Sequence, residues 1–238
     1  MMSTLLRRWV RGVRFIGKVV TGREVWMRSR VSAVTEFHGS EYGGWAILAD
    51  SLDASSTVLS FGIGDDCTFD LALIAKYGCT VHGFDPTPKS IAWVESNIHD
   101  PRFVFHPWAL AGHSGTLELY LPVHPDHVSA SLRPGTHVSA GRVQVPCFDP
   151  RMLMQRLGVA EIDVLKMDIE GAEYEVIDRL VTDGELRKVR QLLIEFHHWL
   201  PAFGAAATRR ALHQLRQAGF VPCWISPSGH EVLFVPRP

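Results

Sequence analysis

The sequence places four side chains capable of acid–base chemistry directly after two apolar runs. Asp168 and Glu170 follow one run, and Glu195 and His197 stand at the end of another. Residues two apart on a strand face the same side, so we expect three carboxylates and one imidazole to gather at one place. A histidine with an ordinary pKa near ~6.5 suits proton removal at neutral pH. His197 is therefore the first candidate for a general base, ahead of Asp168 and Glu195.

The same acidic residues allow two other interpretations. Asp168, Glu170 and Glu195 could hold a divalent metal, because carboxylate oxygens are hard ligands, although we favour a site without metal. They could also form a hydrogen-bond network that only supports the fold. Of their neighbours, Glu173 is expected to be a surface or N-terminal charge of a helix, and Lys166 to pair with one of the acids.

A glycine turn follows another apolar run of the sequence, Thr57–Phe61. Gly62 and Gly64 would let the backbone approach a ligand closely, or they simply make a tight turn. Asp85 stands at the end of the next apolar run, just before Pro86. A carboxylate there can accept hydrogen bonds from both ribose hydroxyls of an adenosine ligand, or it can cap the following helix.

Two acids occupy the position where a dinucleotide pyrophosphate would meet a helix N-terminus. Asp65 and Asp66 would repel phosphate, and Cys67 stands where the third glycine of a dinucleotide fingerprint is expected. The acids would tolerate or attract a cationic ligand. This favours S-adenosylmethionine, which carries a sulfonium and an ammonium, over NAD.

The pattern of apolar runs predicts the elements that must position these residues. Runs typical of buried strands alternate with helical stretches, which indicates an α/β fold with a doubly wound, mostly parallel sheet. Two runs near the end, Phe220–Ile225 and Glu231–Val235, flank a turn and predict an antiparallel C-terminal hairpin. Pro122–Gly141 is expected to be a loop that closes over substrate.

The charge of the chain is unevenly distributed. The 24 Lys and Arg nearly balance the 25 Asp and Glu, and a net charge of -1 argues against a nucleic-acid-binding protein. Residues 1–31 nevertheless hold eight cations and one anion. We divide the chain into a basic N-terminal extension, residues 1–35, and one catalytic domain, residues 36–238.

The N-terminal extension shows the period of an amphipathic helix. Leu5, Trp9 and Val13 fall on one face, and arginines fall on the opposite face. Three interpretations stay open. The helix could pack on the domain or on a partner subunit, lie on an anionic membrane surface, or serve as an organellar transit peptide.

The cysteine and hydropathy patterns bear on the compartment. The four cysteines are widely spaced and form no CxxC pair, which favours a reduced cytoplasmic setting. No run approaches the roughly 18–20 apolar residues of a membrane span. Arginines interrupt the N-terminal apolar stretches, unlike a secretory signal. We expect a cytoplasmic protein, with attachment to a membrane surface through residues 1–31 as the alternative.

One stretch gives the sequence a family resemblance. The run from Asp163 to Glu173, with its Lys-x-Asp-x-Glu-Gly-x-Glu pattern, resembles the signature of the FkbM-type methyltransferases, a branch of the class I S-adenosylmethionine-dependent, Rossmann-like fold. The resemblance covers about residues 40–235. The other stretches that match in order are Tyr42-Gly43-Gly44-Trp45, the Gly62 and Gly64 loop, Cys67–Asp70, Asp85, Trp108-Ala109-Leu110 and Glu195-Phe196-His197.

The resemblance implies methyl transfer from S-adenosylmethionine, most often to oxygen. By position, Gly62 and Gly64 would cradle the methionine part and Asp85 would hold the ribose. Trp108 to Leu110, including Ala109, would border the adenine, and Tyr42 to Trp45 could close over the cofactor. Ser60 stands where many class I enzymes have an acid, so Asp65 or Asp66 would have to contact the methionine amine.

The expected reaction is O-methylation of a hydroxyl on a small-molecule or sugar-containing metabolite. N-methylation is the alternative within enzymes. A protein that binds S-adenosylmethionine without catalysis, recruited to a membrane or partner by its N-terminal helix, is the alternative outside them.

Overall fold

The computed structural model describes residues 17–121 and 141–237. Residues 1–16, which carry most of the expected amphipathic helix, and residues 122–140, which carry the expected substrate loop, lie outside the described residues. The strands are β1 (Thr35–His38), β2 (Trp45–Leu48), β3 (Thr57–Phe61), β4 (Thr80–Phe84), β5 (Phe103–His106), β6 (Ala109–Leu110), β7 (Gly115–Tyr120), β8 (Arg142–Phe148), β9 (Ile162–Met167), β10 (Val189–Glu195), β11 (Phe220–Ile225) and β12 (Glu231–Pro236). The labelled helices are α2 (Thr68–Tyr77), α3 (Pro88–Asn97), α4 (Pro150–Leu157), α5 (Glu173–Thr182) and α6 (Gly204–Gln217), with the 3-10 helix η1 (Glu185–Lys188).

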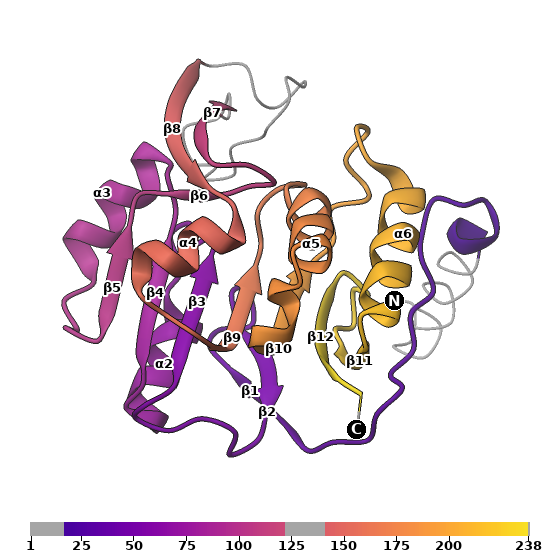
Figure 1. The fold of residues 1–238 in the computed structure, drawn as a ribbon, viewed down its shortest axis with the longest axis horizontal. Helices are drawn as coiled ribbons and strands as arrows, with labels where there is room; N and C mark the ends of the chain where they lie inside the picture. The colour runs from indigo at the N-terminus through magenta and orange to yellow at the C-terminus, as the bar shows by residue number, and fades with distance from the viewer. Residues whose placement is uncertain (1–16, 122–140, 238) are drawn as a thin grey trace, which may run out of the picture.

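The largest sheet within the described residues runs in the order β11-β12-β10-β9-β3-β4-β5 (Figure 1). Neighbouring strands from β10 to β5 are parallel, whereas β12 runs antiparallel to both β10 and β11. The predicted α/β fold with a mostly parallel sheet is therefore confirmed. The chain begins this sheet at β3, builds outward to β5 and returns to β9, so the strand order reverses beside β3. Ligand sites of such sheets lie at this reversal, beyond the carboxyl ends of the strands.

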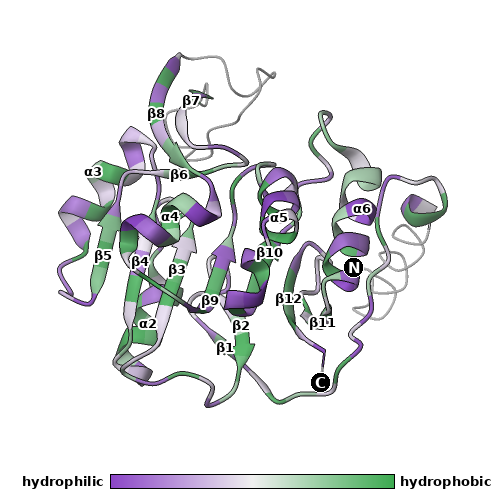
Figure 2. Cartoon of the chain, in the orientation of Figure 1, coloured by the Kyte–Doolittle hydropathy of each residue, from purple (hydrophilic) through white to green (hydrophobic). Residues whose placement is uncertain are grey.

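Apolar side chains on the two faces of the sheet form two cores. Along β10, Leu192 and Ile194 belong to one cluster and Leu193 to the other, as the two-residue period of a strand requires. The first cluster includes residues of α4, α5 and α6, and the second includes residues of β2, α2 and α3. Hydrophobic residues concentrate along the central strands, whereas α3, α4 and α6 show both kinds of residue (Figure 2). The sheet is thus covered on both faces.

Several short elements escaped the sequence prediction. They are β1 and β2, which pair antiparallel, and β6, which lies beside β8 in a second small sheet completed by β7. Helix α4 also went unpredicted, although Asp149 caps it by accepting a hydrogen bond from Met152 N at 3.0 Å and Gly158 ends it in the left-handed region. These capping residues were readable signals of a helix boundary.

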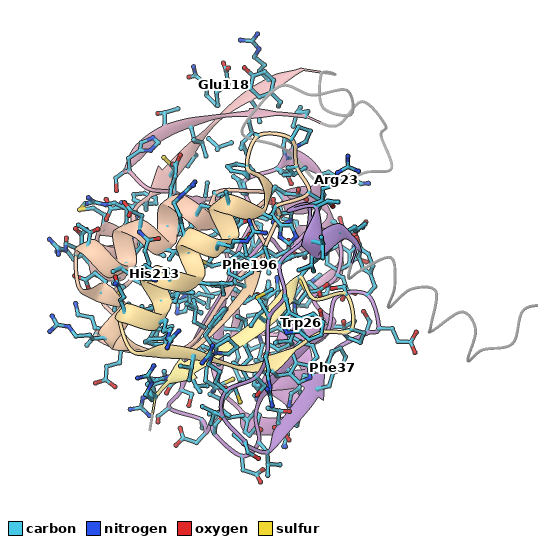
Figure 3. All side chains as sticks on the ribbon, turned by 90° about the vertical axis from the view of Figure 1, so that its right-hand side faces the viewer. Arg23, Trp26, Phe37, Glu118, Phe196 and His213 are labelled. Atoms are coloured by element: carbon cyan, nitrogen blue, oxygen red, sulfur yellow. The ribbon has the colours of Figure 1, made fainter. Side chains whose placement is uncertain are left out.

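The segment before β1 runs along the domain surface. Ser29 Oγ donates to the Cys223 carbonyl at 2.8 Å, and Arg30 N donates to the Pro222 carbonyl at 2.8 Å, so the segment lies beside β11. Figure 3 shows Trp26 of this segment near the β11–β12 hairpin. No helix in the described part of the chain is long and apolar enough to cross a membrane.

Candidate active site

A cleft of about 570 Å³ opens at the carboxyl ends of β3, β4, β9 and β10. Its volume is typical of small-molecule and cofactor sites. All of the site residues predicted from the sequence line this cleft, and the structure therefore brings them together. They are Tyr42, Gly43, Gly44, Gly62, Gly64, Asp65, Asp85, Pro86, Trp108, Ala109, Asp168, Glu170, Glu195 and His197.

Gly62 is fixed by the close approach of two strand ends. Its φ is +78°, and a Cβ placed on it would lie 1.8 Å from the Asp168 carbonyl oxygen. The Asp168 N–H in turn donates to the Phe61 carbonyl at 3.2 Å. Only glycine fits here, because any side chain would force β3 and β9 apart. The close approach holds the glycine loop beside the acidic residues that follow β9.

Asp85 is buried and faces the cleft from the end of β4. Its Oδ2 accepts a hydrogen bond from Gly64 N at 3.0 Å, and its Oδ1 accepts from the N–H and hydroxyl of Thr87 at 2.9 and 2.7 Å. Burial raises the pKa of Asp85, although these hydrogen bonds oppose the rise. Thr87, rather than Asp85, is the N-cap of α3. Asp85 therefore joins the glycine loop to the next strand and presents its remaining lone pairs to the cleft.

Asp66 supports the loop of residues 40–44 instead of pointing an unengaged carboxylate at a ligand. Its Oδ2 accepts from Ser40 Oγ at 2.7 Å, and its Oδ1 accepts from Thr68 N at 2.7 Å. Ser40 Oγ also accepts from Gly43 N at 2.8 Å. Asp65, by contrast, is exposed along the cleft. Of the two acids expected to contact a cationic ligand, Asp65 is the better placed.

Lys166 lies buried in β9 beneath the glycine loop. Its Nζ donates to the carbonyls of Phe61 and Gly62 at 3.1 Å each and lies 5.6 Å from the centre of the Trp45 ring. These main-chain oxygens take the place of the acid partner predicted from the sequence. The charge of Lys166 also opposes the effect of burial on Asp70, which raises the pKa of that carboxyl to about 6. The buried Lys166 ammonium thus holds the glycine loop in place through these two hydrogen bonds.

Aromatic rings border the opposite end of the cleft. Trp108 lies 4.6 Å from His106 between ring centres, and the Arg156 guanidinium lies 4.7 Å from the centre of the Trp108 ring. Phe84 stacks on Phe61 at 4.1 Å. A planar aromatic ligand group could stack here, because rings attract at these separations.

A buried histidine organises the acidic end. His197 is 2% exposed, and its main-chain N–H and Nδ1 lie 2.9 and 3.2 Å from Glu173 Oε1. Its Nε2 faces the cleft acids, 3.6 Å from Asp168 Oδ1 and 3.7 Å from Glu170 Oε2. Glu173 is 0% exposed, and its Oε2 accepts from Gly171 N at 2.9 Å. Of the two positions expected for Glu173, the helix surface is wrong, whereas the helix N-terminus agrees with its place as the first residue of α5, from which its carboxylate contacts His197.

The surroundings of His197 argue against its predicted role as general base. Burial alone would lower the pKa of His197, but the carboxylates around the ring outweigh burial and raise this pKa to about 10. An imidazole that keeps its proton at neutral pH cannot accept another one. The argument from an ordinary histidine pKa failed because Glu173 could not be placed beside the ring from sequence.

Glu195 has a pKa that suits a general base better than that of His197 does. Burial, together with the charge of Asp168, raises the pKa of the Glu195 carboxyl to about 8, although the charge of His197 opposes the rise. A carboxyl whose pKa lies near the working pH can both accept and return a proton. Asp168, Glu195 and His197 also offer ligand atoms within 4.8 Å of one another, so the metal alternative extends to His197 rather than to carboxylates alone.

The backbone after β9 adopts an uncommon conformation. Glu170 has a φ of +52°, in the left-handed region that non-glycine residues rarely occupy. Gly171 follows with a φ of +103°, and a Cβ there would lie 2.1 Å from the Phe203 ring. Such local strain concentrates at functional sites. This turn carries Glu170, whose Oε2 lies 3.7 Å from His197 Nε2.

The charge of the lining suits a cationic ligand. Lys166 contributes a buried cation, but acids predominate along the walls, and close like charges favour the binding of a positive group. The acidic members are Glu41, Asp65, Asp66, Asp85, Asp168, Glu170, Glu195 and Glu231. Glu231 was not predicted, since it reaches the cleft from the last strand, and Trp199 lines the cleft from the turn after β10.

Comparison with known proteins agrees with this geometry. The family described as the Methyltransferase FkbM domain matches residues 54–222. The chain belongs to this family. The FkbM match contains the glycine loop, Asp85 and the acidic end of the cleft, whereas Tyr42 and Glu231 lie outside it.

Two similar proteins also have names that refer to methyltransferases. Probable methyltransferase-like protein 24 of Homo sapiens is 33% identical over 148 residues, which is 60% of this chain and 33% of that protein. Its counterpart in Rattus norvegicus is 26% identical over 211 residues, which is 84% of this chain and 51% of that protein. The FkbM chain described here thus spans about a third to a half of the length of these relatives.

Proposed function

We propose that this FkbM methyltransferase binds S-adenosylmethionine in the cleft and methylates a hydroxyl oxygen of a small or sugar-containing metabolite. The observation that carries the proposal is the pairing of two unlike ends in one cleft. One end holds the Gly62 loop and Asp85, and the other holds Glu195 beside Asp168. The first suits an adenosine ligand, and the second suits removal of a hydroxyl proton.

The residues of the cleft fit the cofactor by chemistry. S-adenosylmethionine supplies a methyl group already activated by a positive sulfur. The exposed carboxylate of Asp65 suits its ammonium, the Asp85 carboxylate suits its ribose hydroxyls, and the Trp108 ring suits its adenine. Gly62 and Gly64 line the cleft beside these groups, where they would border the methionine part.

The acidic end then has two tasks. It must align the acceptor hydroxyl with the methyl group, and such alignment can supply about 7–11 kcal/mol of the barrier. It must also take the hydroxyl proton as the oxygen forms its bond to carbon. We assign the proton to Glu195. Asp168 raises the basicity of Glu195, and His197, held by Glu173, fixes the positions of the acids.

A screen with labelled S-adenosylmethionine and a panel of hydroxyl compounds tests the proposal. We expect label to transfer to at least one class of hydroxyl acceptor, and Glu195→Gln to slow transfer by about 10²–10⁴-fold while cofactor affinity persists. Glu95→Gln makes the same change at an exposed position of α3 and should transfer label at the normal rate. Cofactor binding without transfer to any acceptor would favour the non-catalytic alternative.

A further inference from the structure

Three potential metal ligands converge outside the cleft, behind Trp199. They are Glu24 from the segment before β1, His198 from the turn after β10, and His230 from the turn before β12. One ligand atom from each lies within 4.8 Å of the other two. None of the three lines the cleft. The cluster is therefore separate from the site of the proposed methyl transfer.

The three side chains are removed from solvent to different degrees. The His198 side chain is 0% exposed and the Glu24 side chain 8%, while that of His230 is 25% exposed. His198 Nε2 contacts Glu24 Oε1, and His230 Nε2 lies 3.5 Å from the same oxygen. His230 Nε2 is itself buried and has no hydrogen-bond partner in the described part of the chain. A buried imidazole nitrogen without a partner is costly, which suggests that something else satisfies it.

A contact on its far side orients the His198 imidazole toward Glu24 and His230. His198 Nδ1 lies 3.3 Å from Thr208 Oγ1, which lies 2.9 Å from the Tyr174 hydroxyl. When Nδ1 donates its hydrogen to Thr208, Nε2 presents a lone pair toward Glu24. Metal-binding histidines are held in this way, with the far nitrogen bonded to an oxygen acceptor.

We propose that Glu24, His198 and His230 bind a divalent transition-metal ion, with Zn²⁺ the best match. Two imidazole nitrogens and one carboxylate oxygen form a three-residue donor set that zinc accepts, leaving a fourth position for water. A single cation at the common point satisfies the unpartnered His230 nitrogen and the two atoms that face it. The ion joins the segment before β1 to both chain turns beside Trp199.

An ion bound by His230 would lie close to Trp199, a residue of the cleft wall. The Trp199 ring centre lies 4.3 Å from that of His230 and 4.9 Å from that of His197. Trp199 also lines the cleft. A metal that fixes His230 therefore fixes one wall of the cleft as well, and it fastens the N-terminal segment across the domain.

Zinc binding to the full chain tests this inference independently of methyl transfer. After dialysis against a chelator, titration with Zn²⁺ in competition with a chromophoric chelator should give one tight site per chain. Glu24→Gln and His230→Ala should each weaken that site by more than the roughly 10–100-fold that loss of an outer hydrogen-bond partner costs. Circular dichroism and S-adenosylmethionine affinity report whether each variant is folded.

Two variants control for other ligands on the chain. His213→Ala removes an exposed histidine of α6 (Figure 3), and Glu195→Gln removes a carboxylate of the cleft cluster; both should keep the tight site. Co²⁺ bound in place of zinc should give the visible absorption of a four-coordinate site, and this absorption should disappear in His230→Ala. A wild-type chain that binds no zinc, or equal zinc affinity in His230→Ala and His213→Ala, overturns the proposal.

Limited proteolysis gives a second readout that needs no variant. Arg28 and Arg30 are exposed trypsin sites just beyond Glu24. Removal of the metal should speed cleavage at these arginines, because the segment loses one of its attachments. Equal cleavage rates with zinc and with chelator would contradict the fastening role.

Discussion

At the scale of single residues, environment changes what each titratable group can do. The general base that we propose is Glu195 rather than His197, because the pKa of His197 rises to about 10 and that of Glu195 to about 8. This assignment depends on Glu173, a carboxylate brought in from α5 by folding. Residue types and spacing identified the members of the cluster, whereas the extent of these pKa shifts depends on burial and on Glu173.

The pH dependence of turnover follows from the raised pKa of Glu195. A base must be ionised before it accepts a proton, so kcat should rise with pH through about 8 and level off above that value. A pH profile of kcat under cofactor saturation measures this. A base with the ordinary pKa of a carboxyl would give a profile already flat at pH 7, and that result would remove Glu195 from the role.

Glu173 should be important for stability as well as for the site. Glu173→Ala leaves His197 buried without its partner and leaves the Gly171 N–H unpaired. Breaking such a buried charge pair costs about 3–5 kcal/mol. Chemical denaturation should show this loss, while Glu175→Ala, at an exposed position of the same helix, should change the free energy of unfolding by less than about 0.5 kcal/mol. Equal stability of the two variants would show that the pair is not formed.

At the scale of elements, the site depends on how closely β3 and β9 end beside each other. Gly62→Ala should disrupt this contact, because its Cβ would meet the Asp168 carbonyl oxygen at 1.8 Å. Gly158 has a similar φ of +69° but has nothing within 4 Å of an added Cβ. Gly158→Ala should therefore show only the cost of a positive φ, about 1 kcal/mol.

Thermal unfolding and cofactor binding of these two variants separate two reasons for a glycine. Gly158→Ala tests the positive φ alone, whereas Gly62→Ala tests the positive φ together with the close contact to Asp168. Gly62→Ala should unfold at a clearly lower temperature than Gly158→Ala, and its affinity for S-adenosylmethionine should fall. If the two variants behave alike, the left-handed conformation alone explains the glycine, and the approach of the strands has no special role.

The strands of the central sheet were the most predictable elements. β3 was predicted with its observed bounds, and β4 is the apolar run predicted to end at Asp85, because such short apolar runs are closed by glycine or Asp-Pro. β1, β2 and β6 have four residues or fewer, and their stability comes from partners that local pattern does not reveal. The turns after β10 and before β12 are similar, since His198 and His230 contact Glu24, a residue far away in sequence.

At the scale of the whole molecule, the cleft assembles residues from nearly the whole length of the catalytic domain. The loop of residues 40–44, the ends of four parallel strands and the first residue of β12 all contribute. The order of strands in the sheet decides which of these ends meet. Residue spacing and family resemblance could indicate the members of the site, including its acidic cluster, while the partners of the buried Lys166 and the position of Glu173 required the assembled sheet.

The charge of the molecule also separates by region. The cleft gathers carboxylates, whereas residues 1–31 hold eight cations, and the described end of this segment, at Ser29 and Arg30, docks beside β11. A near-zero total charge therefore averages an acidic cleft and a basic segment. The acidic cleft suits a cationic ligand. For the basic segment, packing on the domain or a partner subunit, binding to an anionic membrane surface and a transit peptide are the three interpretations of its sequence.

Calorimetric titration of the full chain with S-adenosylmethionine tests the central claim most directly. We predict binding at one site per chain, and we predict that Asp85→Asn weakens it by roughly tenfold or more, as expected for loss of hydrogen bonds to a charged group. Asp178→Asn, an exposed aspartate of α5, should bind like the wild type. Absence of binding at millimolar cofactor, or equal affinity in Asp85→Asn and Asp178→Asn, would contradict the account.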